Sequence, residues 1–277
     1  MNNKTIISIA LSGILGLGFA SSAFSKSIVS GHINIDITTG TIKNTANTAN
    51  STSTTSVASL NNSRIKYNAD IKVKIGSITS VASGPGAKAN TNVASIHNTY
   101  VEGSLKIDAK AGNFINKASG YNSKSDINFA VLNKSRGWYD KNITIKSKDV
   151  YSLSSGANSV SQVNAASLLN AQTNYTKMNV ETKSLISVAS GHNSRSVINL
   201  STVKDNSVLR NFETTVKTGN IITNANASNS VATANVASVL NNSYVGGNTK
   251  INVTSGDIVV SANATNATST VALGTLY

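Results

Sequence analysis

Apolar and polar residues alternate along most of the chain. In residues 71–75 two lysines separate three apolar side chains, and residues 251–253 follow the same pattern. A period of two is typical of a β-strand with one buried face, whereas an amphipathic helix would repeat every 3.6 residues. β-branched residues dominate these stretches, and Gly, Ser and Asn cluster between them as turns. The pattern predicts an all-β protein.

A four-residue motif, Val-Ala-Ser-Leu, recurs at regular intervals. Its copies, the third and fifth of them degenerate, begin at Val57, Val93, Phe129, Ala165, Leu200 and Val236, so that successive copies lie 35 or 36 residues apart. A second motif, Gly-x-Ile-x-x-x-Ala-x-Gly, follows in several units, as at Gly76 and Gly112. Repeats of this length indicate stacked units that share one continuous core.

A second regularity has half the length of this repeat. Large apolar residues recur at every eighteenth position, with a one-residue deletion near Leu185. The predicted core columns are Leu60, Ile78, Ile96, Phe114, Leu132, Val150, Leu168, Val203, Ile221 and Val239. We interpret them as an amyloid-like β-solenoid of stacked rungs of about 18 residues, paired into repeats of about 36 residues.

The alternative is that each 36-residue unit forms one layer, and two polar columns bear on this choice. One column contains Lys74, Lys110, Lys146 and Lys217, and the matching half-unit column contains Asn92, Asn128, Asn164, Asn199 and Asn235. Rungs of about 18 residues would separate neighbouring lysines by about 9.6 Å, and layers of about 36 residues by about 4.8 Å. The repulsion in water is about 0.4 kcal/mol at the first spacing and about 0.9 kcal/mol at the second. We therefore favour the shorter rung.

The two polar columns have different expected roles. The lysines are predicted to form a basic outer face. The asparagines are predicted to form an amide ladder along the axis, as in cross-β stacks. An alternative is that asparagine only tolerates turn dihedral angles at these positions.

The N-terminal segment, residues 1–25, reads as a secretory signal peptide. It carries Lys4, an apolar run over residues 6–20 and small residues up to Ser25. The run is shorter than the roughly 20 residues that span a bilayer. Residues 26–56 are predicted to be a partial repeat, residues 57–272 six repeats, and residues 273–277 an incomplete terminal repeat.

Composition restricts the chemistry. The 277 residues include no cysteine, which excludes disulfides and thiolate sites, and only three histidines, His32, His97 and His192, at non-equivalent repeat positions. No paired carboxylates, phosphate loop or nucleophile elbow is present, so we expect no enzyme, cofactor or metal. The net charge of +13 favours weak binding to anionic polysaccharide or extracellular DNA, although a solubilising role explains it more simply.

The sequence positions of the aromatic residues do not indicate a surface for binding nucleic-acid bases. Tyr67, Tyr100, Trp138, Tyr139 and Tyr175 are spread along the sequence, so we expect no stacking surface for bases.

Two repeat types resemble known fibre subunits. Residues 92–98, 164–170 and 235–241 resemble the Asn-x-Ala-x-Val-x-Gln core of curlin repeats, with Asn in place of Gln, and residues 255–275 are similar to Fap-type repeats. The Fap cysteine pair is absent, and curlin rungs are a few residues longer. The resemblance implies an extracellular homopolymer at the bacterial surface that serves biofilm and adhesion, with an outer-membrane export pore and a nucleator subunit as partners.

A solenoid without caps supports the same expectation, because unpaired edges at both ends favour head-to-tail growth. We see no capping helix in residues 28–40, and the chain stops at the start of another rung. The main alternative is a monomeric β-helical surface adhesin that binds a host molecule or anionic polysaccharide. An ice-binding solenoid would need a threonine column, and a polysaccharide lyase would need recurring acidic clusters; the sequence shows neither.

Overall fold

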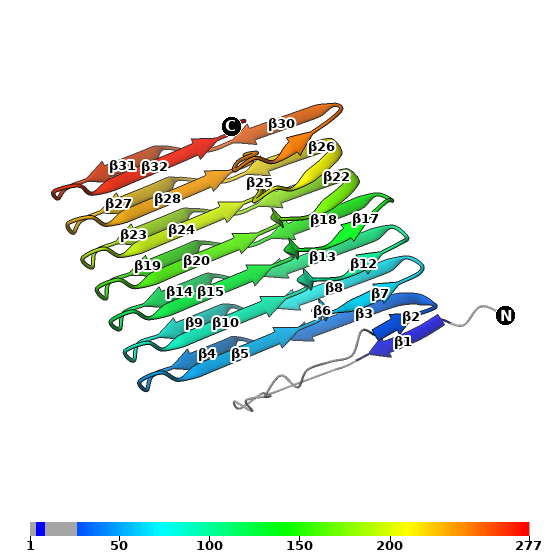
Figure 1. Ribbon diagram of the computed structural model, residues 1–277, viewed down its shortest axis with the longest axis horizontal. Helices are drawn as coiled ribbons and strands as arrows, with labels where there is room; N and C mark the ends of the chain where they lie inside the picture. Colours follow the sequence, from blue (N-terminus) through cyan, green and yellow to red (C-terminus); the bar gives the residue numbers. More distant parts are fainter. Residues whose placement is uncertain (1–3, 9–26, 277) are drawn as a thin grey trace.

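The protein is a parallel β-solenoid of about seven turns (Figure 1). The computed structural model describes residues 4–8 and 27–276, and this part of the chain contains strands, turns and bends but no helix. Every pair of neighbouring strands is parallel, and each turn of the chain lies on the one before it. The all-β class predicted from the alternation and the solenoid predicted from the repeats are both confirmed.

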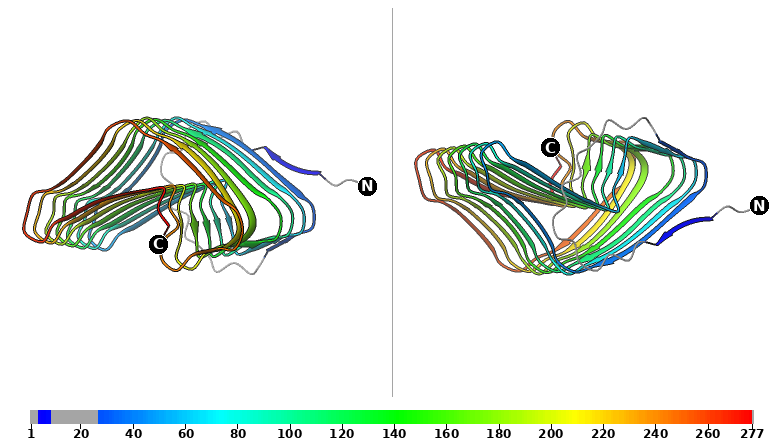
Figure 2. Two further views of the ribbon diagram at one scale, coloured as in Figure 1. Left: turned by 90° about the horizontal axis from the view of Figure 1, so that it is seen from above. Right: turned by 90° about the horizontal axis from the view of Figure 1, so that it is seen from below.

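One turn shows the course of the chain. Its strands are β7 (Ser63–Ile65), β8 (Ala69–Ile75), β9 (Ile78–Ala82), β10 (Lys88–Val93) and β11 (Ile96–His97). Strands β9 and β10 form a narrow arm that ends in a tight turn, and β7, β8 and β11 surround a wider lobe. Viewed along the axis, the stacked turns trace a bent outline with the arm on one side and the lobe on the other (Figure 2).

The strands form four sheets, which we label A to D. Sheet A has the long strands β3 (His32–Thr39), β8, β13 (Leu105–Ala111), β18 (Lys141–Lys146), β22 (Gln172–Glu181), β26 (Val208–Lys217) and β30 (Thr249–Thr254), with β1 (Lys4–Ser8) beside β3. Its short strands are β2 (Ser27–Val29), β7, β12 (Tyr100–Val101), β17 (Arg136–Gly137) and β29 (Tyr244–Val245). Strands β22 and β26 are continuous across both parts, which joins them into one sheet.

The other three sheets each take one strand from a turn. Sheet B contains β4 (Ile42–Ala46), β9, β14 (Phe114–Ala118), β19 (Val150–Ser154), β23 (Leu185–Ala189), β27 (Ile221–Ala225) and β31 (Ile258–Ala262). Sheet C contains β5 (Thr52–Val57), β10, β15 (Lys124–Phe129), β20 (Val160–Ala165), β24 (Arg195–Leu200), β28 (Val231–Val236) and β32 (Thr268–Leu273). Sheet D contains β6 (Leu60–Asn61), β11, β16 (Leu132–Asn133), β21 (Leu168–Leu169) and β25 (Val203–Lys204).

The strand register shows that one turn is the whole repeat, so the prediction of a rung half that length is wrong. Ile78 pairs with Phe114 in sheet B, and Leu60 pairs with Ile96 in sheet D. Residues half a repeat apart therefore lie in different sheets of the same turn. The predicted core column is two columns: Ile78, Phe114, Val150 and Ile221 in sheet B, and Leu60, Ile96, Leu132, Leu168, Val203 and Val239 in or beside sheet D.

A small change of register occurs within the solenoid. Lys141 pairs with Thr176, one residue short of the full repeat, whereas Arg136 pairs with Gln172 at the full interval. The deletion that the sequence suggested near Leu185 therefore falls at the preceding corner of sheet A. Sheets B and C absorb it without losing their pairing.

The interior of the lobe is filled by large apolar side chains, and the interior of the arm by smaller ones. Nine of the ten predicted core residues are at most 4% exposed, and Leu60, in the first described turn of sheet D, is partly buried against the same cluster. Phe114 of sheet B and Phe129 of sheet C pack with ring centroids 4.7 Å apart where the arm meets the lobe. Towards the tip of the arm the inward side chains are alanines and serines, because sheets B and C approach closely there.

The first and last segments follow the same register. Residues of β3, β4 and β5 pair with β8, β9 and β10, so the predicted partial repeat forms part of the stack. The predicted signal peptide lies outside the described residues except for β1, which pairs with β3. Near the other end, Leu276 bridges to Val239.

Candidate functional site

An asparagine ladder runs along the outer face of sheet C. The Nδ2 groups of Asn128, Asn164, Asn199 and Asn235 each donate to the Oδ1 atom of the asparagine one turn earlier, at 3.0, 2.8, 2.7 and 2.8 Å. Asn92 accepts the first of these bonds. All five lie within strands and none has a positive φ, so turn dihedral angles do not account for them. The amides tie five successive turns together.

The chain bends sharply inward directly after each ladder strand. The alanine of the Val-Ala-Ser motif has a positive φ of 47–53° in five turns, as at Ala94 and Ala166, and Ser201 and Gly274 take its place in two others. This left-handed conformation disfavours residues with a Cβ by about 1 kcal/mol. Ala94 is fully buried at the bend. The Ser95 hydroxyl lies 3.0 Å from the Asn128 carbonyl oxygen of the next turn, which fixes the bend to its neighbour.

The bend creates a groove of about 290 Å³ between sheet C and sheet D. The ladder residues Asn92 and Asn128 line it together with Asn90, Asn133 and His97. The pKa of His97 is lowered by burial and by the nearby charge of Lys134. In later turns Leu169, Val197 and Leu240 occupy groove positions and are buried, so the groove is polar and open only near the first turns.

Removing one rung of the ladder tests its contribution to stability. Asn164 bonds to both neighbouring asparagines and accepts from the Gln162 side chain, so Asn164→Ala leaves three side-chain amides short of a partner at a site that is 4% exposed. We expect a loss of about 2 kcal/mol in the free energy of unfolding. Urea titration followed by circular dichroism measures it. The exposed Asn252→Ala is the control and should change the value by less than about 0.5 kcal/mol.

The lysine column lies on the outer face of sheet A on directly adjacent strands. Lys74 pairs with Lys110, and Lys110 with Lys146, so the expected spacing of two strands is wrong. Glu181 follows Lys146 and precedes Lys217, and its carboxylate lies 2.8 Å from the Lys146 ammonium. Hydrogen bonding and charge attraction between them raise the pKa of Lys146 and lower the pKa of Glu181. Both side chains are exposed, so the pair contributes little to stability.

A second lysine position is buried, which the sequence reading missed. Lys141 is 1% exposed and pairs with Leu105, which in turn pairs with Ala69. Its Nζ donates to the Gly103 carbonyl oxygen at 2.8 Å, and burial lowers its pKa to about 8 although Asp140 opposes the shift. Gly137 makes room for it, since a Cβ there would lie 2.5 Å from the Lys141 Cε.

Polar side chains also fill part of the arm. The inward column of sheet B contains Asn44, Ser80, Asn116, Ser152, Ser187 and Thr223, all fully or nearly fully buried. The Asn116 Nδ2 donates to the Ser125 and Gln162 carbonyl oxygens at 2.7 and 2.8 Å, which satisfies both of its hydrogens. These groups hold sheets B and C together, and they are not accessible to a substrate.

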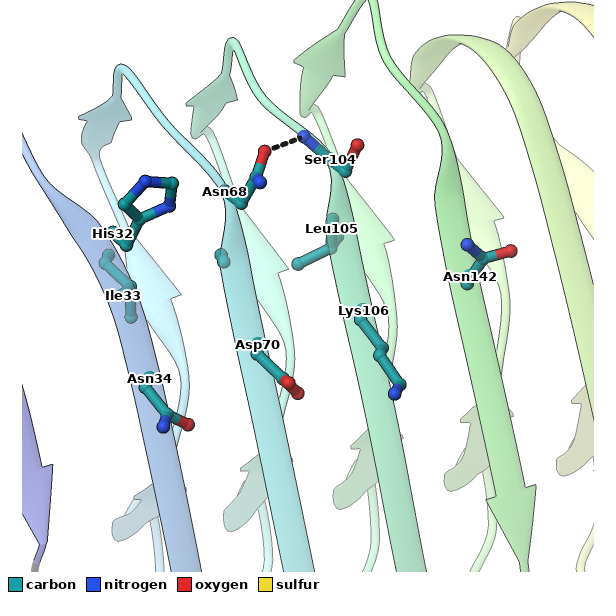
Figure 3. A pocket seen from close by; sticks show the side chains of 10 residues that line it. His32, Ile33, Asn34, Asn68, Asp70, Ser104, Leu105, Lys106 and Asn142 are labelled. Carbon is teal, nitrogen blue, oxygen red and sulfur yellow. Dashed lines mark hydrogen bonds between the residues drawn. The ribbon is translucent and has the colours of Figure 1, made fainter.

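A shallow depression of about 460 Å³ lies on the outer face of sheet A, beside the corner between its short and long strands (Figure 3). Its polar lining comes from four successive turns: His32, Asn34, Asn68, Asp70, Ser104, Lys106 and Asn142. Side chains of Asn34, Asp70, Lys106 and Asn142 project from neighbouring strands (Figure 3). The Asn68 Oδ1 accepts a hydrogen bond from the Ser104 amide at 2.8 Å, which fixes the upper border.

Aromatic residues gather at the same corner, which corrects the expectation that they are scattered. Tyr67 and Tyr139 lie one full repeat before and after Gly103, so the three occupy equivalent corner positions in successive turns. Tyr67, Trp138 and Tyr139 are 50%, 65% and 62% exposed. Tyr100 is on the adjoining short strand, where the Arg64 guanidinium lies 5.8 Å from its ring centre. The sequence did not reveal this cluster, because the residues share a corner only in the register of the full repeat.

The described residues contain no cluster of side chains that could hold a metal ion. Within residues 4–8 and 27–276, no three His, Asp or Glu side chains lie close enough to hold a metal ion. His32, His97 and His192 belong to sheet A, sheet D and the tip of the arm. The described residues also contain no helix with the length and apolar character that a membrane crossing requires.

Comparison with other proteins does not extend these findings. No protein-family model, curated protein or solved structure matches this chain. The likeness to curlin and Fap repeats therefore remains a resemblance of sequence pattern alone.

Proposed function

We propose that this chain is a secreted structural subunit that stacks end to end into amyloid-like extracellular fibres, comparable to the curlin and Fap classes, for biofilm matrix and surface adhesion. The observation that carries the proposal is the state of the two end turns. Among the described strands, β30, β31 and β32 each pair on one side only, as do β4 and β5 at the opposite end. Open parallel edges of this kind favour pairing with a second copy.

The two end faces are matched in their inward side chains. If a second copy continues the register, Ile258 lies on Ile42, Val253 on Ile37, and Leu273 on Val57, each pair in one existing column. The end strand β31 exposes its inward side chains Ile258 and Val260 by 45% and 46%, and stacking would cover both. β1 lies against β3, so removal of the predicted leader would free that edge as well.

The proposal extends to the partners that such fibres need. The subunit binds further copies of itself head to tail. Such a contact joins two different surfaces and leaves one of each free at the ends, so the assembly grows into a filament and not into a closed ring. An outer-membrane export pore and a nucleator subunit follow from the resemblance to curlin. The alternative of a monomeric adhesin predicts a soluble protein under the same conditions.

A matched pair of variants in β31 tests the stacking. Ile258 occupies an inward column and Val259 the adjacent outward column, and their exposures are 45% and 51%. Ile258→Asp places a charge in the proposed junction, so we expect it to abolish fibres seen by electron microscopy and thioflavin T fluorescence. Val259→Asp should assemble at close to the normal rate.

Both variants must keep the monomer's circular dichroism spectrum for the comparison to hold. Fibre formation by Ile258→Asp at the normal rate would contradict the proposed junction. Wild-type protein that stays monomeric at high concentration after removal of residues 1–25 would favour the adhesin instead.

A further inference from the structure

The depression beside the sheet A corner has the composition of a saccharide site. Its lining holds the amides of Asn34, Asn68 and Asn142, the carboxylate of Asp70 and the ammonium of Lys106. Amides donate and accept, and carboxylates accept, in nearly fixed planes, which suits the closely spaced hydroxyls of a sugar ring. We propose that this depression binds a stretch of uronate-containing polysaccharide.

One acceptor in the floor favours a ligand that brings hydroxyl groups. The Asp70 Oδ1 is buried and has no hydrogen-bond donor among the described residues. The Asp70 side chain as a whole is partly exposed, so a ligand hydroxyl can donate to its carboxylate from the open side. Lys106, one strand away at the paired position, offers a cation for the uronate carboxylate of the same ligand.

Aromatic side chains border the depression on its corner side. The Tyr67 ring is half exposed and lies 5.3 Å from the His32 ring, which itself lines the depression. Tyr139 stands two turns further along the axis, about 9.6 Å at the usual strand spacing. Gly103 lies between them without a side chain, since a Cβ there would come within 2.5 Å of the Tyr67 carbonyl carbon. The apolar faces of sugar rings pack on exposed aromatic rings of this kind.

Charge around the corner attracts an anionic polymer, and the interrupted aromatic series disfavours a nucleic acid in the depression. Lys66, Lys106 and Arg136 are exposed on these turns, and Arg64 is paired with Glu102. Asp70 acts on a phosphate and on a uronate carboxylate alike, so charge does not separate the two polymers and the aromatic rings decide between them. Single-stranded nucleic acid needs successive bases stacked on aromatic rings. Here Gly103 interrupts the aromatic series.

Binding of an alginate oligosaccharide to freshly purified chain, measured by isothermal titration calorimetry, tests the site. We expect Tyr67→Ala to weaken binding about tenfold, as is common for an aromatic anchor, and Lys106→Gln to weaken it about fivefold. Two controls match these changes in residue type and exposure. Tyr121→Ala alters a tyrosine that is 57% exposed at the tip of the arm, and Lys110→Gln alters an exposed lysine on the same face of sheet A. Both should leave affinity within about twofold.

The controls and competing ligands decide between outcomes. Equal losses in the control variants, or unchanged affinity in Tyr67→Ala and Lys106→Gln, would overturn the site. So would dextran sulfate or a short oligothymidylate that binds as tightly as alginate with the same sensitivity to Tyr67→Ala. All lining residues belong to one chain, so binding does not require assembly. A failure here would leave the fibre proposal standing.

Discussion

Replacing Ile96 with lysine is expected to destabilise the solenoid by about 4 kcal/mol and to abolish assembly, because the new ammonium would lie in a dry column. Ile96 is completely buried and pairs with Leu60 and Leu132 in the turns on either side. In a solenoid each turn contacts only its neighbours, so disrupting one turn separates the stack into two weaker parts. Urea unfolding should then show a further transition that the original protein lacks.

Lys110→Ser is the matched change on the outer face. Lys110 is exposed between Lys74 and Lys146, so its removal also relieves repulsion between like charges. We expect a change within about 0.5 kcal/mol and normal assembly. Circular dichroism during urea titration measures stability, and electron microscopy measures assembly. Similar effects of the two substitutions would contradict the assignment of inner and outer faces.

The second large effect concerns Lys141. Its pKa is about 8 in the folded protein, so below that pH the fold contains a buried ammonium. Above it the folded state is neutral while the unfolded chain stays charged up to about pH 10.5. Stability should therefore rise with pH between these values, by about 3 kcal/mol in total.

Replacing the lysine with methionine should remove this pH dependence. We expect Lys141→Met to be about 2 kcal/mol more stable than the original protein at pH 7, since an apolar side chain of similar length replaces a buried charge. The advantage should shrink as the pH approaches 10.5. The loss of the bond to the Gly103 carbonyl keeps the gain below the full value. A variant that is less stable at pH 7, or a difference that is independent of pH, would disprove the buried-charge account.

Much of the fold follows from local pattern. Alternation in residues 71–75 predicts that Ile71, Val73 and Ile75 point inward, and all three are buried. The recurrence of Val-Ala-Ser predicts the repeat length, because the motif returns every 35 or 36 residues. Both features depend on neighbours in the sequence, which is why the sequence alone suffices for them.

The length of one turn could not be obtained in the same way. The two halves of each turn both place a large apolar residue after a corner, as at Ile78 and Ile96, so the half-repeat spacing is real but does not mean contact. The lysine argument failed because the repulsion at issue is below about 1 kcal/mol in water. Burial of one large apolar side chain contributes more than that, about 2 kcal/mol.

The buried polar residues were missed in the sequence analysis for one reason. Asn116 and Lys141 occupy inward positions by simple alternation with Phe114 and Ile143, yet the core columns predicted from the sequence contained only apolar residues. Their hydrogen bonds come from residues 9 to 46 positions away, which only the three-dimensional stack reveals. The same holds for Tyr67 and Tyr139, whose shared corner becomes visible once the register of the full repeat is known.

The asparagine ladder has a direction. Every hydrogen bond in it is donated toward the first turn, and all the strands run parallel, so the two extremities of the molecule differ chemically. A filament made of such units would be polar, with a different surface at each end. Its two tips would elongate at different speeds, and a molecule that blocks one tip would leave the other free to grow.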